Sequence, residues 1–339
     1  MAGLTILVVN AGSTSLKLSA VEADDSAVAV ASLASAPEGV AAVAHRLVHG
    51  GARFLEPVVI DDAVRRELEA LSELAPLHNV PALAAIDEAR RALPSVPHVA
   101  VFDTAFHATI PDEARTYALP PRWREEWGIR RFGFHGLSVA WAAERVPVSR
   151  LVVCHLGGGC SVTAVLDGRS VDTTMGFSPL EGVPMATRAG SIDPEVLLYL
   201  LRHELASADD LEHALEHESG LLGLGGSSRV EELEASDDPG AELALSVFCY
   251  RVAAAVGSLA TVLGGIDALV FTAGIGEGSA LVRERVCERL GFFGVELDRD
   301  ANREVQPDAD VATDGSPARV WVVHAREDMI AARATRGVL

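Results

Sequence analysis

The stretch Leu4-Thr-Ile-Leu-Val-Val-Asn-Ala-Gly-Ser-Thr-Ser-Leu-Lys-Leu-Ser-Ala-Val21 decides the fold of this chain. An apolar, β-branched run leads into a turn rich in Gly and Ser, and a second run follows in which polar and apolar residues partly alternate. This pattern is typical of a strand, a tight turn and a second strand. The sequence therefore predicts a β-hairpin near the start of the chain.

A second copy of this pattern lies between Leu151 and Leu166, where Leu-Val-Val-Cys-His is followed by Leu-Gly-Gly-Gly-Cys and Ser-Val-Thr-Ala-Val-Leu. Aligning Gly12 with Gly157 places the two hairpins in register, which indicates an internal duplication. Helical patterns alternate with strands in both halves. We therefore expect an α/β protein with two duplicated domains and a cleft between them. The domains are predicted at 1–147 and 148–324, with a closing helix in 325–339 that packs back on the first.

A third glycine-rich turn has a different form. The apolar run Ala268 to Thr272 enters Ala-Gly-Ile-Gly-Glu-Gly-Ser, which we expect to open into a helix from Leu281 to Leu290. The N-terminus of a helix carries unpaired N–H groups and the positive end of the dipole, which suit a phosphate. A single Gly-x-Gly after a strand is a weak signal. Three glycine-rich turns in one chain, two of them duplicated, favour binding of phosphate or nucleotide.

The composition is typical of a folded protein, since 49% of the 339 residues are hydrophobic and 22% are charged. With 48 acidic and 28 basic residues the formal net charge is −20, so we expect no nucleic acid and no anionic membrane as partner. The apolar window Val252 to Ile266 is shorter than the ~20 residues of a membrane span and predicts a buried helix. A secretory signal and metal-ligand cysteine spacings are not recognisable, which favours a cytoplasmic protein with buried cysteines.

An anionic substrate of so acidic a protein needs local cationic groups. Lys17 is the only lysine, and a codon bias toward arginine explains the other basic residues but not this one, since the two side chains differ as ligands. Arg46, in His45-Arg-Leu-Val-His-Gly-Gly51, and Arg188 both stand among small and apolar residues. Each arginine alone is compatible with a structural ion pair. Together they favour an anion clamp.

Two further residues have competing interpretations. Asp103 directly follows the apolar run His98 to Phe102, at a strand end where α/β proteins collect functional groups, but it could equally cap the next turn. His135 lies between Phe134 and Gly136, and a histidine in such surroundings is more often a core residue than a functional one.

Taken together, these segments resemble the acetokinase family, within the superfamily of actin-like sugar kinases and chaperones. The resemblance implies two actin-like (ribonuclease H-like) domains and reversible phosphoryl transfer from ATP to acetate, giving acetyl phosphate and ADP. The matching stretches run in family order along nearly the whole chain: Val8-Val-Asn-Ala-Gly-Ser-Thr-Ser-Leu-Lys17, His45-Arg-Leu-Val-His-Gly-Gly51, Ala75-Pro-Leu-His-Asn79, Phe102-Asp-Thr-Ala-Phe-His107, Arg130-Arg-Phe-Gly-Phe-His-Gly136, Met175-Gly-Phe-Ser-Pro-Leu-Glu-Gly182, Thr187-Arg-Ala-Gly-Ser-Ile-Asp-Pro194 and Phe271-Thr-Ala-Gly-Ile-Gly-Glu277.

The resemblance also implies roles for individual residues. Arg46 and Arg188 would hold the acyl carboxylate and the transferring phosphoryl group, His135 would bond that group in the transition state, and Asp103 would orient the reacting groups. Asn10 and Glu327 would help to hold Mg2+, or Mn2+ in its place. The phosphates and the nucleotide would contact Ser13, Ser15, Lys17, His155, Gly157, Gly159, Gly274 and Gly276. A small apolar pocket for the acyl group would be lined by Val48, Leu77, Phe134 and Pro179, next to Arg46.

This set of residues suits phosphoryl transfer, which needs in-line positioning and neutralisation of charge more than covalent help. The departures from the family pattern lie mainly on the nucleotide side. Gly158 and Gly278 stand where the family has asparagine, and Arg229-Val-Glu231 inverts the charges of its Asp-x-Arg. Val139 stands where it has a second histidine. The chain is shorter than typical members of the family, and most of the difference in length falls between Val21 and Val43.

Three alternatives therefore stay open beside the ATP-dependent acetate kinase reaction. The donor could be pyrophosphate or another phosphoryl donor, the acceptor could be propionate, or the chain could bind nucleotide without turnover. One methylene in an apolar pocket contributes only ~1–3 kcal/mol, so the sequence does not separate acetate from propionate. The resemblance further implies a homodimer built through the second domain.

Overall fold

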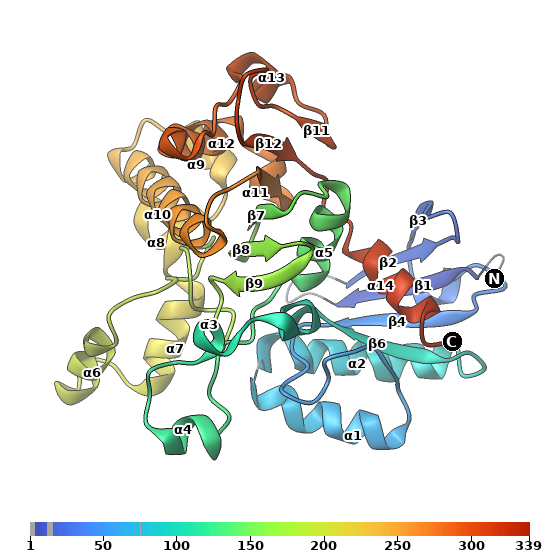
Figure 1. Ribbon diagram of the computed structural model, residues 1–339. Helices are drawn as coiled ribbons and strands as arrows, with labels where there is room; N and C mark the ends of the chain where they lie inside the picture. The colour runs from blue at the N-terminus through green and yellow to red at the C-terminus, as the bar shows by residue number, and fades with distance from the viewer. Residues whose placement is uncertain (1–3, 12–15, 75) are drawn as a thin grey trace. The chain divides into compact units, whose positions relative to one another are not determined.

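The computed structural model describes residues 4–11, 16–74 and 76–339, and for 73–78 no side chains are described. The chain forms two compact units (Figure 1). The first comprises 1–109, 132–141 and 326–339, and the second comprises 110–131 and 142–325. Residues 110–131, which the sequence assigned to the first domain, thus group with the second unit.

The first unit is built on a six-stranded mixed sheet in the order β3-β2-β1-β4-β6-β5. The first three strands are antiparallel neighbours, β4 and β6 run parallel to β1, and β5 pairs antiparallel with β6 at the edge. Their bounds are β1 (Ile6–Ala11), β2 (Leu16–Val21), β3 (Ala27–Val30), β4 (Ala42–Leu47), β5 (Val58–Val59) and β6 (His98–Phe102).

The second unit repeats this sheet. Its order is β11-β12-β10-β7-β8-β9, with the same antiparallel hairpins at one end, the same parallel strands in the middle and an antiparallel edge strand. The bounds are β7 (Arg150–Leu156), β8 (Cys160–Leu166), β9 (Arg169–Thr173), β10 (Ala268–Thr272), β11 (Ala309–Asp310) and β12 (Arg319–Val322). The duplication that the two hairpins predicted is confirmed, because it extends to the order and direction of all the strands in both sheets.

The helices fill the connections between strands, as the α/β interpretation requires. Those that begin in the first unit are α1 (Asp62–Ala70), α2 (Pro76–Ala92), α5 (Gly136–Arg145) and α14 (Glu327–Arg336), with short 3-10 turns η1 (Leu33–Ser35), η2 (Leu71–Leu74) and η3 (Asp103–Thr109). Those of the second unit are α3 (Asp112–Arg115), α4 (Pro121–Glu125), α6 (Pro194–Arg202), α7 (Ala208–His217), α8 (Gly220–Gly225), α9 (Val230–Glu234), α10 (Pro239–Leu263), α11 (Ala273–Gly278), α12 (Ala280–Cys287) and α13 (Arg299–Glu304), with η4 (Gly291–Phe293).

Helix α10 is the one described helix that is long and apolar enough to span a membrane. Its ends are set locally: the Asp238 side chain accepts from the N–H of Gly240, Pro239 opens the first turn, and Gly264 ends the helix in the left-handed conformation. Half of its most apolar window is buried inside the second unit. It packs against β7, β8 and β9, so it is the core helix that the sequence predicted.

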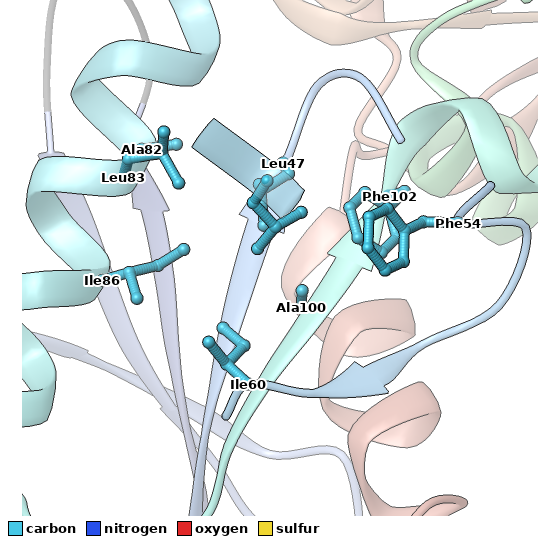
Figure 2. Close-up of a cluster of buried hydrophobic side chains, with 9 residues drawn as sticks. Leu47, Phe54, Ile60, Ala82, Leu83, Ile86, Ala100 and Phe102 are labelled. Carbon is cyan, nitrogen blue, oxygen red and sulfur yellow. The ribbon is translucent and has the colours of Figure 1, made fainter. Parts of the chain in front are cut away.

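Two faces of the first sheet carry different chemistry. On one face, Leu47, Ala100 and Phe102 pack with Leu83 and Ile86 of α2 in a buried apolar cluster (Figure 2). Side chains alternate along a strand, so Arg46 points to the opposite face from Leu47. That opposite face is covered by α14, which packs against β1, β4 and β6. The sheet thus separates this apolar cluster from the face on which Arg46 lies.

The third glycine-rich turn differs from the expectation. The Gly-Ile-Gly-Glu stretch is itself helical and forms α11, and the next helix, α12, spans Ala280–Cys287 rather than reaching Leu290. Ala273 begins α11 at φ 65°, a left-handed conformation that is strained for a residue with a side chain. The Ser279 hydroxyl then accepts from the N–H of Val282 and starts α12. The predicted turn is therefore a short helix, and Ser279 caps a second helix that begins one residue before the predicted start.

Buried histidines of the first unit make its stability depend on pH. His45 and His98, on neighbouring strands, share a hydrogen bond of 2.9 Å between Nε2 and Nδ1, and His107 Nε2 lies 2.9 Å from the carbonyl oxygen of Phe134. Burial lowers the pKa of His45 to about 3 and that of His107 to about 4. Both rings are therefore neutral in the folded protein at pH 5.

We expect the free energy of unfolding to fall as the pH drops from about 6.5 toward 4. Below about pH 6.5 these histidines bind protons in the unfolded chain, whereas in the folded protein their rings stay neutral. Each such ring contributes a slope of roughly 1.4 kcal/mol per pH unit. His107→Gln keeps a donor for the Phe134 carbonyl and should lower the slope by about that amount. Urea denaturation at pH 7, 6 and 5 measures both slopes, and equal slopes would contradict the assignment.

Candidate active site

Three polar side chains stand in one row across the first sheet. Asn10 of β1 pairs with Lys17 of β2 on one side and with Arg46 of β4 on the other. Residues paired across neighbouring strands project from the same face of a sheet. Asp103 follows directly at the end of β6, the next strand in the row, and Glu327 begins α14 above this face. Five residues named from the sequence thus come from five elements.

Arg46 is the centre of this group. Its Nε and Nη2 donate to the two carboxylate oxygens of Asp103 at 3.2 and 2.7 Å, which is a bidentate pair. Its Nη1 donates to Asn10 Oδ1 at 3.1 Å and lies 3.1 Å from Glu327 Oε2. Asn10 Nδ2 also donates to Glu327 Oε2, at 3.2 Å. The four residues form one hydrogen-bonded cluster.

Burial dominates the electrostatics of this cluster. Desolvation opposes the charge on Arg46, but the carboxylates of Asp103 and Glu327 outweigh it and raise the pKa of Arg46 above its ordinary value. Burial also raises the pKa of Asp103, whose side chain is 0% exposed, against the opposing effect of Arg46 and a hydrogen bond from the backbone N–H of Leu137. The bidentate contact with a permanently charged arginine keeps Asp103 ionised.

His135 is held close to this cluster by its neighbours. The structure packs Gly136 so tightly against Asp103 that a Cβ atom at Gly136 would lie 2.0 Å from the Asp103 carbonyl oxygen. His107 holds the carbonyl of Phe134 on the other side. His135 itself is left-handed, with φ 58°, directly before α5. Strained backbone of this kind persists where the surroundings fix it and is frequent at functional sites.

The two glycine-rich turns of the second unit lie against each other. A Cβ atom at Gly157 would lie 3.5 Å from Ala273 Cβ and 3.9 Å from the backbone nitrogen of Gly274. His155, at the end of β7, pairs with Thr272, at the end of β10. The Gly157 N–H is directed to the carbonyl of Gly159 across the β7–β8 turn. Gly276 follows in α11, so the nucleotide-binding residues named from the sequence are grouped in one place in this unit.

Arg188 belongs to the second unit and pairs with a residue that the sequence analysis did not name. Its Nε donates to Glu216 Oε2 at 2.7 Å, and each side chain is 14% exposed. Glu216 lies in α7, in a helix whose sequence carries no family motif among those quoted above. Only the packing of α7 reveals this partner. Arg188 thus forms the structural ion pair that the sequence left open, and its part in an anion clamp stays a prediction.

The remaining residues of the predicted set are distributed between the units. Val48 is half-buried and Phe134 fully buried in the first unit, and Pro179 is buried in the second. Ser13, Ser15 and the side chain of Leu77 lie outside the described part of the chain. The sequence also missed His107 and the Leu137 N–H, which support Phe134 and Asp103.

The polar cluster suits a metal ion only together with a substrate. Among the described residues, no three His, Cys, Asp or Glu side chains are arranged to hold an ion by themselves. Glu327 and Asn10 offer one carboxylate and one amide oxygen, and the Oε1 atom of Glu327 takes part in none of the contacts described above. Mg2+ is usually bound by one or two protein oxygens, water and substrate phosphates. The residues present fit that pattern.

Comparison with known proteins settles the family. A family model described as the acetokinase family matches residues 31–333. The chain belongs to the acetokinase family. This acetokinase chain is 43% identical over 300 residues to the acetate kinase of Protochlamydia amoebophila, covering 86% of the chain and 76% of that protein. It is 46% identical over 298 residues to the acetate kinase of Nostoc punctiforme, covering 84% and 73%.

Solved structures agree with this assignment of family and fold. A propionate kinase from Francisella tularensis superposes with a TM-score of 0.91 at 31% identity, covering 99% of this acetokinase chain and 100% of that one. The acetate kinase of Porphyromonas gingivalis superposes with a TM-score of 0.87 at 30% identity, covering 99% of each chain. The fold predicted from the two hairpins, a pair of similar actin-like α/β domains, is confirmed.

The two glycines that replace family asparagines stand in open space. A Cβ atom at Gly158 or at Gly278 would meet no atom within 4 Å, whereas one at Gly136 would strike the backbone. Neither glycine has a positive φ. Both positions of this acetokinase could therefore carry a side chain without strain.

We expect Asp103→Asn to leave the buried Arg46 charge poorly compensated. Breaking a buried ion pair costs about 3–5 kcal/mol, and misplacing a positioned group costs roughly 100-fold in rate. Thermal denaturation and kcat should both show the loss. The matched control is Asp87→Asn, which breaks the more exposed pair of Asp87 with Arg65 and should cost at most ~1 kcal/mol with kcat unchanged. Similar effects of the two variants would contradict the special role of Asp103.

Proposed function

We propose that this acetokinase-family chain transfers a phosphoryl group from ATP to a short-chain carboxylate, acetate or propionate, giving the acyl phosphate and ADP. The observation that carries the proposal is the half-buried Arg46, which Asp103 holds by a bidentate contact while the guanidinium stays charged. Three of its five N–H groups donate hydrogen bonds in the described contacts, and Nη1 also pairs with Glu327, which leaves one N–H on Nη2 for a substrate anion.

In this proposal each residue binds or neutralises charge, and none acts as a strong base. A carboxylate is already ionised at pH 7 and is a sufficient nucleophile, so the protein has to overcome the repulsion between two anions. Arg46 and Arg188 supply that charge, His135 donates to the transferring phosphoryl group, and Lys17 stands beside Asn10 for the phosphates. A bound Mg2+ would neutralise phosphate charge, held by Glu327 and Asn10. These site roles are proposals.

Residues on the side of the phosphoryl donor support a second candidate reaction, in which the donor is not ATP. Gly158 and Gly278 leave open space beside the two turns of the second unit, and Arg229 forms an exposed pair with Glu232. Contacts that the family makes to the nucleotide through asparagine are thus missing from this chain. The same acceptor chemistry with pyrophosphate or another donor is therefore the alternative. We place the reaction in the cytoplasm, in keeping with an acidic enzyme whose four cysteines are free and buried.

Hydroxylamine trapping tests the reaction. Purified protein with Mg2+, ATP and acetate or propionate should form the acyl hydroxamate, and chelation of Mg2+ should abolish it. Arg188→Ala should lower the rate by roughly 100-fold or more, while Arg299→Ala, on the exposed α13, should not. Hydroxamate formed with pyrophosphate but not with ATP would move the assignment to the second candidate. No hydroxamate with any donor would contradict both reactions and leave a nucleotide-binding protein.

We further propose a homodimer formed through the second unit. Helix α6 has no buried residue, and Val196, Leu198, Tyr199 and Leu201 are each 41–52% exposed on it. Clustered exposed apolar side chains mark an interaction surface, and a twofold dimer buries one such patch against its copy. Light scattering should give twice the chain mass for the wild type and a monomer for Leu198→Glu. Val28→Glu, at an exposed apolar position of the first unit, should stay dimeric; a monomeric wild type would contradict the proposal.

A further inference from the structure

A polar network in the second unit connects two separate segments, 110–131 and the loop after β9, and is not needed for any role assigned above. It consists of Tyr117, Arg131 and Glu181, which we call the clasp. Arg131 is the last residue of segment 110–131, and its backbone N–H donates to the carbonyl of Arg115 at 2.9 Å. Glu181 lies in the loop after β9, within the motif that contains Pro179.

Arg131 holds the backbone of that loop at consecutive residues. Its Nη1 donates to the carbonyl oxygens of Thr173, Thr174 and Met175 at 2.7, 3.0 and 3.1 Å. Its Nη2 donates to Glu181 Oε1 at 3.0 Å, and its side chain is only 16% exposed. A planar guanidinium can serve several acceptors in fixed directions, which an ammonium group cannot. The arginine therefore determines the path of the chain from residue 173 to residue 175.

Tyr117 holds the next part of the same loop. Its hydroxyl donates to Glu181 Oε2 and accepts the backbone N–H of Phe177 at 2.9 Å. Burial and the neighbouring Glu181 raise the pKa of Tyr117 above its ordinary value, so the hydroxyl stays protonated and remains a donor. Pro179 thus lies between two anchored residues, Phe177 and Glu181.

The loop is fitted closely around the clasp. A Cβ atom at Gly176 would lie 1.6 Å from Glu181 Oε2 and 2.0 Å from the Tyr117 hydroxyl oxygen. A larger residue at position 176 would displace the Glu181 carboxylate and the Tyr117 hydroxyl from these positions. A network that served general stability alone would not need contacts to four backbone groups of one short loop together with such a close approach.

We propose that the clasp positions Pro179, and that it thereby sets the preference of the enzyme among short carboxylates. This rests on the proposed function and on the role in the acyl pocket that the family resemblance implies for Pro179. One methylene in such a pocket changes kcat/KM by roughly 10- to 200-fold when the walls are well placed. If the loop moves by a fraction of an ångström, the ratio of kcat/KM between two acids therefore changes more than the KM for ATP does. Tyr117, Arg131 and Glu181 are positioning residues here, since they act through the loop.

The test uses Tyr117→Phe, which removes one hydroxyl, and Arg131→Lys, which keeps the charge but loses the fork. Both should raise the KM for acetate by about 5- to 10-fold, as the loss of one or two hydrogen bonds does. The ratio of kcat/KM between propionate and acetate should change at least threefold, with the KM for ATP within twofold of the wild type. Arg131 and Glu181 line a cavity of about 310 Å³ that Arg251 also lines. The control is Arg251→Lys, because the Arg251 guanidinium lies over the ring of Tyr250 and has no part in the clasp. The proposal is overturned if the ratio of kcat/KM between propionate and acetate is unchanged in both variants. It is also overturned if the KM for ATP changes as much as the KM for acetate.

Hydrogen exchange separates this proposal from the reaction itself. Amides of residues 172–182 should exchange about 10-fold faster in Tyr117→Phe than in the wild type, and those of residues 268–278 should not change. Unchanged exchange in an active enzyme overturns the clasp and leaves the reaction standing. An inactive wild type overturns the proposed function, and with it the effect on acid preference, even where exchange confirms that the clasp holds the loop.

Discussion

The bidentate contact between Arg46 and Asp103 is the interaction on which the first unit depends for its chemistry. A charged arginine in a sheet face is stable there only because Asp103, directly after β6, and Glu327, at the start of α14, compensate it. The closing helix is therefore joined to the sheet by charge as well as by apolar packing. Because Asp103 and Glu327 together outweigh one arginine, the cluster keeps a net negative charge, which suits a bound cation next to a substrate anion.

In the second unit the candidate groups for binding an anion belong to the backbone instead of to side chains. Two turns of glycine and small residues lie in contact at the ends of β7 and β10, and the N–H groups of such turns can approach a phosphate closely. The corresponding hairpin of the first unit carries hydroxyls and Lys17 in its sequence. After duplication, the two hairpins thus carry different candidate donors for an anion.

Much of the fold followed from sequence because its signals are local. A strand, a turn and a strand can be recognised within about twenty residues, and two copies in register already imply repeated sheets. The row of polar side chains across the first sheet could be predicted only in part from the sequence. Motifs located Asn10, Arg46 and Asp103, but their register across β1 and β4 depends on pairing between distant segments. Glu216 and the clasp could not be found this way, since each partner lies on an unrelated element. The short helix α11 was missed because a glycine-rich stretch is typical of a turn.

The single lysine has a consequence for chemical modification. Acyl phosphates react with amines, and guanidinium groups are far weaker nucleophiles, so among its side chains this protein offers one amine, on the exposed Lys17. That amine stands in the same row as Asn10 and Arg46. Among the side chains, an amine-directed label, fluorophore or cross-linker would therefore react at one position, Lys17, in the same row as Arg46.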